Sequence, residues 1–219
     1  MAPDWIPLFP LDVALFPGGE LPLHIFEPRY RAMASRCMER REPFGIVRSV
    51  EETLAEVGCE ARIAHVIRLY PDGRLDVLAR GRRRFRLGEV RSHEDGYIEG
   101  QVLPLDESPE ESDHGIEDRV EERYRRYAAV TGEIPPEPPP RGPRWSYRVA
   151  ERLRLPVADR QLLLETTGEN ARGIRLLSIL EKRIRTAIRS ERLQKTVRGN
   201  GRLHGRGTDP PAAGTGGGT

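Results

Sequence analysis

The sequence predicts an α+β protein, in which a β-rich lobe over residues 1–110 precedes a helical lobe over residues 111–196. Two patterns carry this prediction. Between Cys59 and Leu105, apolar residues recur with period two, the spacing of strands that bury one face. In the later residues they recur every three or four positions, the spacing of amphipathic helices. Because the expected strands follow one another through short connections, they indicate an antiparallel sheet or a small barrel.

The chain opens with apolar and aromatic residues that are interrupted by prolines, from Ile6 to Tyr30. Each proline fixes its own φ and biases the residue before it toward extended backbone, so this run predicts short extended pieces joined by tight turns. Pro28 can open a helix, because its missing N–H loses no partner there. We expect this stretch to form the first packed layer of the fold.

A helix of about three turns is expected after Pro28. Tyr30, Met33 and Cys37 fall on one helical face, and the helix should end before Pro43. A short β-type run follows over residues 44–47.

The period-two region predicts four strands. The first carries alternating residues that would share one face, namely Ala61, Ile63, His65, Ile67 and Leu69. The Pro-Asp-Gly sequence at residues 71–73 predicts a turn, because proline presets φ, aspartate bonds its own backbone and glycine accepts positive φ. A second strand over residues 75–79 would complete a hairpin. Further strands are expected over residues 82–87 and 97–103.

The helical lobe begins with a helix whose apolar face is formed by Ile116, Val120, Tyr124 and Tyr127. Gly132 is the expected stop of this helix. Six prolines then fall between Pro135 and Pro143, which predicts a polyproline-like connection over residues 134–144 that lies outside the packed elements.

Three more helices are expected in the second lobe. Two short ones run over residues 145–153 and 159–165, and the longest follows Asn170, which we assign as its N-cap. The apolar face of the longest helix consists of Ile174, Leu177, Leu180, Ile184 and Ile188. Residues 197–219 are rich in glycine and arginine and cannot bury enough surface to order themselves, so we expect a disordered tail.

Composition favours a protein that works in the cytoplasm without contacting a membrane. Charged residues make up 32% of the 219 residues, and the mean hydropathy is −0.59. No apolar run approaches the roughly eighteen residues of a membrane span, and the N-terminus lacks the pattern of a secretory signal. The formal net charge of +2 gives bulk electrostatics little weight, so we expect no general affinity for nucleic acid.

None of the catalytic or cofactor motifs that we tested is present. Neither lysine, Lys182 or Lys195, follows a glycine, which excludes a Walker-type phosphate loop. There is no Gly-x-Ser-x-Gly elbow and no His-Glu-x-x-His pair. Cys37 and Cys59 form no Cys-x-x-Cys pair, and we expect both to be small buried residues rather than a disulfide or a zinc site. We therefore predict no catalytic, cofactor-binding or metal-binding residues.

Two local patterns, the arginines around Phe85 and the single His24, are each compatible with a structural or a functional role. Arg82, Arg84 and Arg86, interleaved with Phe85, form the best candidate for a nucleic-acid surface. The strand pattern and the flanking acidic residues favour a solvated strand face instead. His24 has no second metal-binding side chain spaced nearby, so we expect a structural histidine.

The opening residues Pro7-Leu8-Phe9-Pro10-Leu11, Leu15-Phe16-Pro17-Gly18 and Leu21-Pro22-Leu23-His24-Ile25-Phe26-Glu27-Pro28-Arg29-Tyr30 resemble the N-terminal substrate-binding domain of the Lon protease family. The resemblance extends over about residues 5–190. Its other matching segments are residues 43–47, 57–63, 71–75, 81–87, 146–150 and 162–165.

This resemblance implies a PUA-like antiparallel β-barrel lobe followed by a small α-helical bundle. It also implies a domain that recognises client proteins and does not cut them, without the ATPase and peptidase modules of full Lon. The proline-rich segment and the glycine- and arginine-rich tail depart from the family pattern, so the resemblance implies nothing about them.

Our leading hypothesis is a stand-alone, non-enzymatic domain that binds exposed apolar segments of client proteins or peptides. The expected surface is the cleft between the lobes, with Phe9, Phe16, Phe26 and Tyr30 as candidate client-binding residues, because aromatic anchors dominate interface energetics. For each of the four, the alternative is a place in the core. An RNA-binding module that uses Arg82, Arg84 and Arg86 is the alternative function, since PUA-like barrels include RNA binders. An adaptor that assembles through residues 134–144 is a third.

Overall fold

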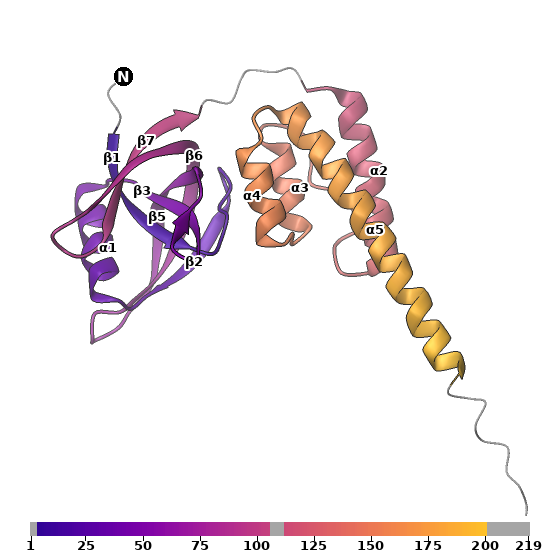
Figure 1. Cartoon of the computed structure of the whole chain (residues 1–219), viewed down its shortest axis with the longest axis horizontal. Coiled ribbons are helices and arrows are strands. Elements are labelled where there is room, and N and C mark those ends of the chain that lie inside the picture. Colours follow the sequence, from indigo (N-terminus) through magenta and orange to yellow (C-terminus); the bar gives the residue numbers. More distant parts are fainter. Residues whose placement is uncertain (1–3, 106–111, 201–219) are drawn as a thin grey trace, which may run out of the picture.

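The computed structural model describes residues 4–105 and 112–200 of the 219-residue chain. Figure 1 shows strands gathered in the N-terminal half and helices in the C-terminal half. The first lobe contains, in chain order, β1 (Asp4–Leu11), β2 (Glu20–Ile25), α1 (Pro28–Arg40), β3 (Phe44–Val50), β4 (Thr53–Leu54), β5 (Val57–Leu69), β6 (Leu75–Ser92) and β7 (Ile98–Leu105). The second lobe contains α2 (His114–Thr131), α3 (Trp145–Arg152), α4 (Val157–Glu165) and α5 (Glu169–Asn200). The α+β prediction is confirmed.

Five strands of the first lobe close into a barrel. The hydrogen-bonded order is β1-β7-β6-β5-β3, and β3 pairs back onto β1, while β2 adds to β6 and β4 to β3. All pairings are antiparallel except β1 with β3, where Leu8 to Leu11 run parallel to Gly45 to Arg48. This parallel pair is an addition to the predicted antiparallel barrel. It is possible because α1 lies in the connection between the two strands, and parallel strands need such a crossover.

The strands expected over residues 75–79 and 82–87 are one element. β6 runs unbroken for 18 residues, so the prediction of a separate third strand is wrong. β6 carries one extra residue, Arg82, opposite the step from Glu60 to Ala61. Such a bulge lets a long strand bend instead of ending. β6 can therefore pair with β2 along its first part and with β7 along its second.

The opening stretch forms the first packed layer, as predicted. Leu8, Phe9 and Phe16 are buried, and β1 inserts between β7 and β3. Pro28 opens α1, whose buried face includes Met33 and Cys37. Both cysteines are free and buried, as expected.

The hairpin of β5 and β6 has the predicted turn but not the predicted apolar face. Gly73 adopts a φ of +82°, and its amide donates to the carbonyl of Tyr70. Ala61 is buried, whereas Ile67 and Leu69 are 62% and 67% exposed. Two register shifts, between Ile63 and His65 and between Val66 and Arg68, interrupt the alternation. The expectation that all five residues from Ala61 to Leu69 share one face is therefore wrong.

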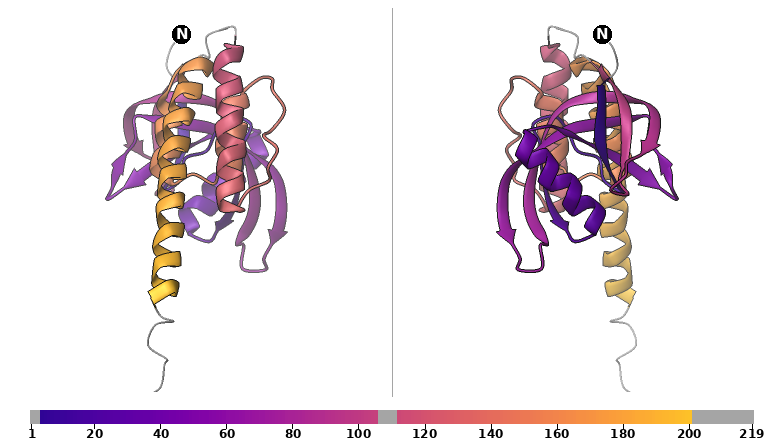
Figure 2. Two further views of the ribbon diagram at one scale, coloured as in Figure 1. Left: turned by 90° about the vertical axis from the view of Figure 1, so that its right-hand side faces the viewer. Right: turned by 90° about the vertical axis from the view of Figure 1, so that its left-hand side faces the viewer.

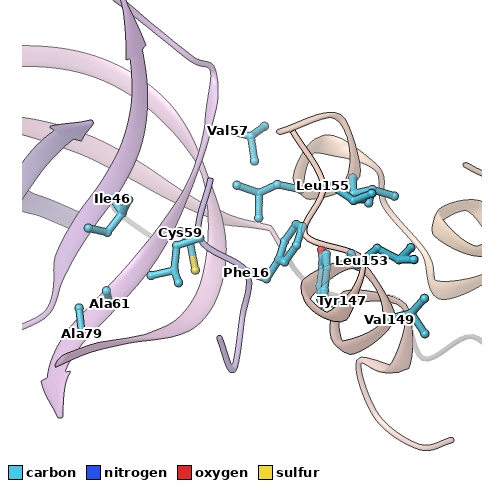
Figure 3. Close-up of a cluster of buried hydrophobic side chains, with 14 of the residues drawn as sticks. Phe16, Ile46, Val57, Cys59, Ala61, Ala79, Tyr147, Val149, Leu153 and Leu155 are labelled. Atoms are coloured by element: carbon cyan, nitrogen blue, oxygen red, sulfur yellow. The ribbon is translucent and has the colours of Figure 1, made fainter. Parts of the chain in front are cut away.

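The two lobes share one hydrophobic core. Figure 3 shows Phe16 of the first lobe between Val57 and Cys59 on one side and Tyr147 and Leu155 of the second lobe on the other. The rings of Phe16 and Tyr147 stack with their centroids 4.7 Å apart. The link between β7 and α2 contains residues 106–111, so the predicted boundary at residue 110 lies outside the described residues.

The proline-rich segment lies outside the helices and strands, as expected, and only Ile134 and Pro139 within it are buried, but hydrogen bonds attach it to α3. A polyproline-like backbone makes no internal hydrogen bonds, which leaves its carbonyl groups to accept bonds from elsewhere. Trp145 Nε1 donates to the carbonyl of Pro139 at 3.0 Å. Arg148 donates to the carbonyls of Pro140 and Pro143 at 2.7 and 2.9 Å. These bonds hold the segment against α3.

α2 matches its prediction. Val120, Tyr124 and Tyr127 are buried, and Gly132 ends the helix with a φ of +65°.

α5 differs from its prediction in its first residue, in its buried face and in its last residue. It begins at Glu169, and Asn170 is not its N-cap, because Asn170 Oδ1 accepts a hydrogen bond from the backbone amide of Asp113.

The predicted apolar face of α5 is confirmed at Leu177, Leu180 and Ile184, which are buried, and is wrong at Ile174. Ile174 is exposed, whereas Leu176 is fully buried. α5 continues to Asn200 and extends past the other helices in Figure 2, so residues 197–200 of the predicted tail are helical. The rest of that tail lies outside the described residues. Within residues 4–105 and 112–200, no helix has the length and apolar character that a membrane span requires.

Candidate functional site

A groove of about 370 Å³ lies along the opening stretch of the chain. We call it the β1–β2 groove. It is lined by Phe9, Pro10, Leu11, Val13, Leu21, Pro22, Leu23, His24, Ile25, Phe26, Glu27, Arg29 and Tyr30. Successive residues of β2 contribute to it, although their side chains alternate between the two faces of the strand. The groove therefore follows the edge of β2.

The edge of β2 is open among the described strands, because β2 pairs only with β6. Pro22 stands within β2 and has no N–H to donate, which fits a strand at the edge of a sheet. The other side of the groove is formed by Phe9, Pro10 and Leu11, which follow the last β1 residue paired with β7. The proline spacing of the sequence thus produces two neighbouring strand ends with an apolar channel beside them.

The floor of the groove contains two of the predicted client-binding residues. The rings of Phe9 and Tyr30 lie 4.3 Å apart between centroids, and both side chains are buried. The guanidinium of Arg29 covers the Tyr30 ring at 4.7 Å and pairs with Glu27 at 2.6 Å. Burial raises the pKa of Tyr30, so its hydroxyl stays neutral. The floor is therefore apolar, with a charged pair at one end.

Phe26 is the predicted residue that is open to a partner. Its side chain is 57% exposed at the rim of the groove, directly after β2. It stacks on His24 with ring centroids 5.8 Å apart, and Tyr70 meets His24 edge-on at 6.0 Å. An aromatic row of Phe26, His24 and Tyr70 therefore borders the groove.

Asp76 holds this aromatic row in place. His24 Nδ1 lies 2.6 Å from Asp76 Oδ1, and the Tyr70 hydroxyl donates to Asp76 Oδ2 at 2.7 Å. The bond from His24, followed by that from Tyr70, lowers the pKa of the Asp76 carboxyl. His24 thus has the structural role that the sequence indicated.

The sequence analysis missed the apolar residues near this rim. Leu69 pairs in register with Leu75, and Leu75 pairs with Ile25, so Leu69 and Phe26 lie at the same end of the sheet. Ile67 and Leu69 are the most exposed large apolar residues of the described strands. The sequence alone does not show that buried and exposed residues stop alternating along β5, because this depends on the register of the strands.

Phe16 is not part of the groove. It is fully buried between the lobes, where Tyr147 stacks on it and the Arg160 guanidinium lies 4.5 Å from its ring centre. The four aromatic candidates therefore do not share the cleft between the lobes. Three of them belong to the β1–β2 groove, and Phe16 belongs to the core.

The arginines of the alternative RNA surface do not form one face. Arg82 and Arg86 are exposed, but Arg84 is among the largest fully buried side chains. Its Nη1 donates to the carbonyls of Leu164 and Thr166 at 2.9 and 3.3 Å. Arg84 thus joins β6 to the end of α4, and the expected surface of three arginines is wrong.

The described residues contain no group of three or more His, Cys, Asp or Glu side chains that could hold a metal ion. The two thiols are shielded from reaction. Burial raises the pKa of Cys59 to about 12 and that of Cys37 to about 11. Both thiols are therefore protonated at neutral pH, whereas nucleophilic cysteines need the thiolate.

Comparison with known proteins places this arrangement in a family. The family model of the "ATP-dependent protease La (LON) substrate-binding domain" matches residues 5–182. The crystal structure of a Lon N-terminal domain protein from Xanthomonas campestris superposes with a TM-score of 0.61 at 28% identity, over 81% of this chain and 98% of that chain.

Two of the curated relatives are named as Lon proteases. Lon protease 1 of Hydrogenovibrio crunogenus is 27% identical over 205 residues, which cover 85% of this chain and 25% of that protein. The Lon protease of Parabacteroides distasonis is 31% identical over 124 residues, 52% of this chain and 15% of that protein. The chain thus spans a quarter or less of the length of these relatives. Because the family model covers most of the chain, the chain belongs to the family of Lon substrate-binding domains.

Proposed function

We propose that this domain binds extended apolar segments of client polypeptides in the β1–β2 groove and does not act on them chemically. The exposure of Phe26 above the Phe9–Tyr30 floor carries the proposal. A partner that covered this half-exposed ring would gain about 1–2 kcal/mol from burial of apolar area. Membership of a substrate-binding family and a match confined to that domain support the non-catalytic role.

The proposed binding mode is strand addition at β2. The backbone groups on the open edge of β2 can pair with an extended peptide, which contributes affinity without regard to sequence. Alternate side chains of that peptide would then enter the apolar groove, which contributes preference for apolar residues. This mode suits a domain that must accept many unfolded chains.

We also propose the cellular compartment in which the domain binds its clients. The composition of the chain favours a cytoplasmic protein, and we place client binding in the cytoplasm. Fractionation of cells that produce the tagged chain tests this point, and recovery of the protein outside the cytoplasm would overturn it.

Fluorescence anisotropy with a labelled unfolded polypeptide tests the binding itself. Phe26→Ser should raise the Kd by about tenfold, because an aromatic anchor that a partner buries contributes more than 1 kcal/mol. Ile174→Ser is a matched control, since Ile174 on α5 is also 57% exposed but lies in the other lobe. Equal affinities for the two variants would contradict the proposed site.

A further inference from the structure

A second hollow, of about 520 Å³, lies on the outside of the barrel where the two lobes meet. We call it the arginine hollow. Its charged lining consists of Arg62 of β5, Arg80 and Arg82 of β6, and Arg144 at the start of α3. The rest of the lining is Gly18, Ala64 and Gly81, which leave the space open because they have no side chain or only a methyl group.

The fold forces the four arginines together. Arg62 and Arg80 are direct cross-strand partners, a placement that brings Cβ atoms to about 5 Å and destabilises a pair of like charges. Gly81 between Arg80 and Arg82 packs inward, where a Cβ would collide with the carbonyl of Phe16. The backbone of Arg144 adopts a left-handed φ of +58°, a conformation that is uncommon for residues other than glycine because it is sterically unfavourable.

Among the described residues, the arginines of this hollow, Arg62, Arg80, Arg82 and Arg144, form no ion pair with a carboxylate. Two nearby carboxylates have other partners. Glu60 pairs with Arg83, and Glu151 lies 4.0 Å from Arg160. Glu20 is the register partner of Arg80 across β2 and β6, but the two side chains form no ion pair.

We propose that the arginine hollow binds a compact, multiply charged phosphate-type oxyanion. Four guanidinium groups around one space need more than a single negative charge, and each group can bond two oxygens of a phosphate in its fork geometry. Arg62 and Arg82 also line a neighbouring hollow together with Glu60, so the positive patch ends on that side. No aromatic residue lines the hollow, so it lacks the stacking platform of single-stranded nucleic-acid sites.

The net charge of the chain, only +2, is a further argument against a nucleic-acid ligand, because it supplies no extended basic track for a phosphate backbone. Inorganic diphosphate supplies the proposed chemistry in its simplest form. A phosphorylated side chain of a partner polypeptide supplies the same group from another source. This inference is independent of the apolar groove, because the two sets of lining residues have no member in common.

Isothermal titration of the full chain with diphosphate tests the proposal. We expect one site per chain and an affinity that falls as salt is added. The double variant Arg80→Gln, Arg144→Gln should lose at least about tenfold in affinity, since bonds between charged groups are removed. Arg126→Gln on α2 is the matched control, an exposed arginine far along the chain from the hollow, and it should bind as the parent does. Absence of binding, or equal losses in both variants, would overturn the proposal.

Thermal unfolding separates ligand binding from a structural role of the arginines. Without ligand, Arg80→Gln should keep or raise the Tm, because it removes repulsion from Arg62. Diphosphate should raise the Tm of the parent protein, since a ligand of the folded state stabilises it. A lower Tm for ligand-free Arg80→Gln would assign a structural role and contradict the inference.

Competition identifies the source of the phosphate. A phosphoserine peptide that displaces diphosphate, when its unphosphorylated form does not, supports a group carried by a partner. Failure of the peptide to displace diphosphate supports a free oligophosphate. A single-stranded RNA that binds without being displaced by diphosphate, together with no diphosphate binding, would replace the proposal with nucleic-acid binding.

Discussion

Phe9 of β1 and Tyr30 of α1 pack with their ring centroids 4.3 Å apart and their planes tilted by 50°. The two residues come from opposite ends of the proline-spaced opening stretch. Their contact closes the bottom of the β1–β2 groove and leaves Phe26 at its rim as the exposed aromatic residue. The geometry separates the opening motif into a part that forms the floor, an exposed part at the rim and, at Phe16, a part that joins the lobes.

The role of Phe16 predicts a loss of stability without a direct contact to client. Phe16→Ala should lower the free energy of unfolding by about 3–5 kcal/mol, because it leaves a cavity under Tyr147 in the shared core. Urea unfolding followed by circular dichroism measures this. Phe26→Ala is the control and should change stability by less than about 0.5 kcal/mol, as surface substitutions do. A similar loss in both variants would show that the assignment of core and rim is wrong.

Arg84 predicts a comparable contrast among the arginines. Arg84→Ala should cost about 2–4 kcal/mol, because the carbonyls of Leu164 and Thr166 lose a buried charged donor. Arg86→Ala, on the same strand and exposed, should have little effect. Chemical denaturation of the two variants gives the comparison. If Arg84→Ala instead weakened RNA binding and left stability unchanged, the alternative function would gain support.

The buried thiols predict a loss of stability in alkaline solution. Burial raises the pKa of Cys37 to about 11 and that of Cys59 to about 12, whereas an unfolded thiol ionises near its ordinary pKa of about 8.5. The unfolded state therefore loses protons first, and the free energy of unfolding falls as the pH rises from about 8.5 toward 11.

The double variant Cys37→Ala, Cys59→Ala isolates this effect. It should be less stable at neutral pH, since both side chains are buried, but its stability should fall less steeply between pH 8.5 and 11. Urea midpoints at a series of pH values provide the slopes. Parallel slopes for parent and variant would contradict the assignment of the alkaline loss to the thiols.

Local chemistry made much of the fold predictable. The Pro-Asp-Gly turn, the α1 face with Met33 and Cys37, and the stop at Gly132 each depend on a few neighbouring residues. The features that were missed depend on residues far apart in the chain. The parallel pairing of β1 with β3 forms only when the barrel closes. The burial of Arg84 depends on a hydrogen bond to the carbonyl of Leu164, which lies 80 residues later in the chain.

The candidate site was predictable to the same extent. The opening motif indicated Phe9, Phe26 and Tyr30, because aromatic residues are the side chains that most often anchor an interface. Sequence alone could not separate Phe16 from them, since the four residues have the same local pattern. Only the contact with Tyr147 shows that Phe16 belongs to the core. The exposure of Ile67 and Leu69 depends on register shifts that the sequence does not mark.

Photo-crosslinking tests the central claim most directly. Benzoylphenylalanine is placed at position 26, and in a second protein at position 174, and each is irradiated with an unfolded apolar polypeptide. We predict crosslinks from position 26 that an unlabelled apolar peptide suppresses, and few from position 174, although both side chains are equally exposed. Equal crosslinking from the two positions, or none from position 26, would contradict client binding in the β1–β2 groove.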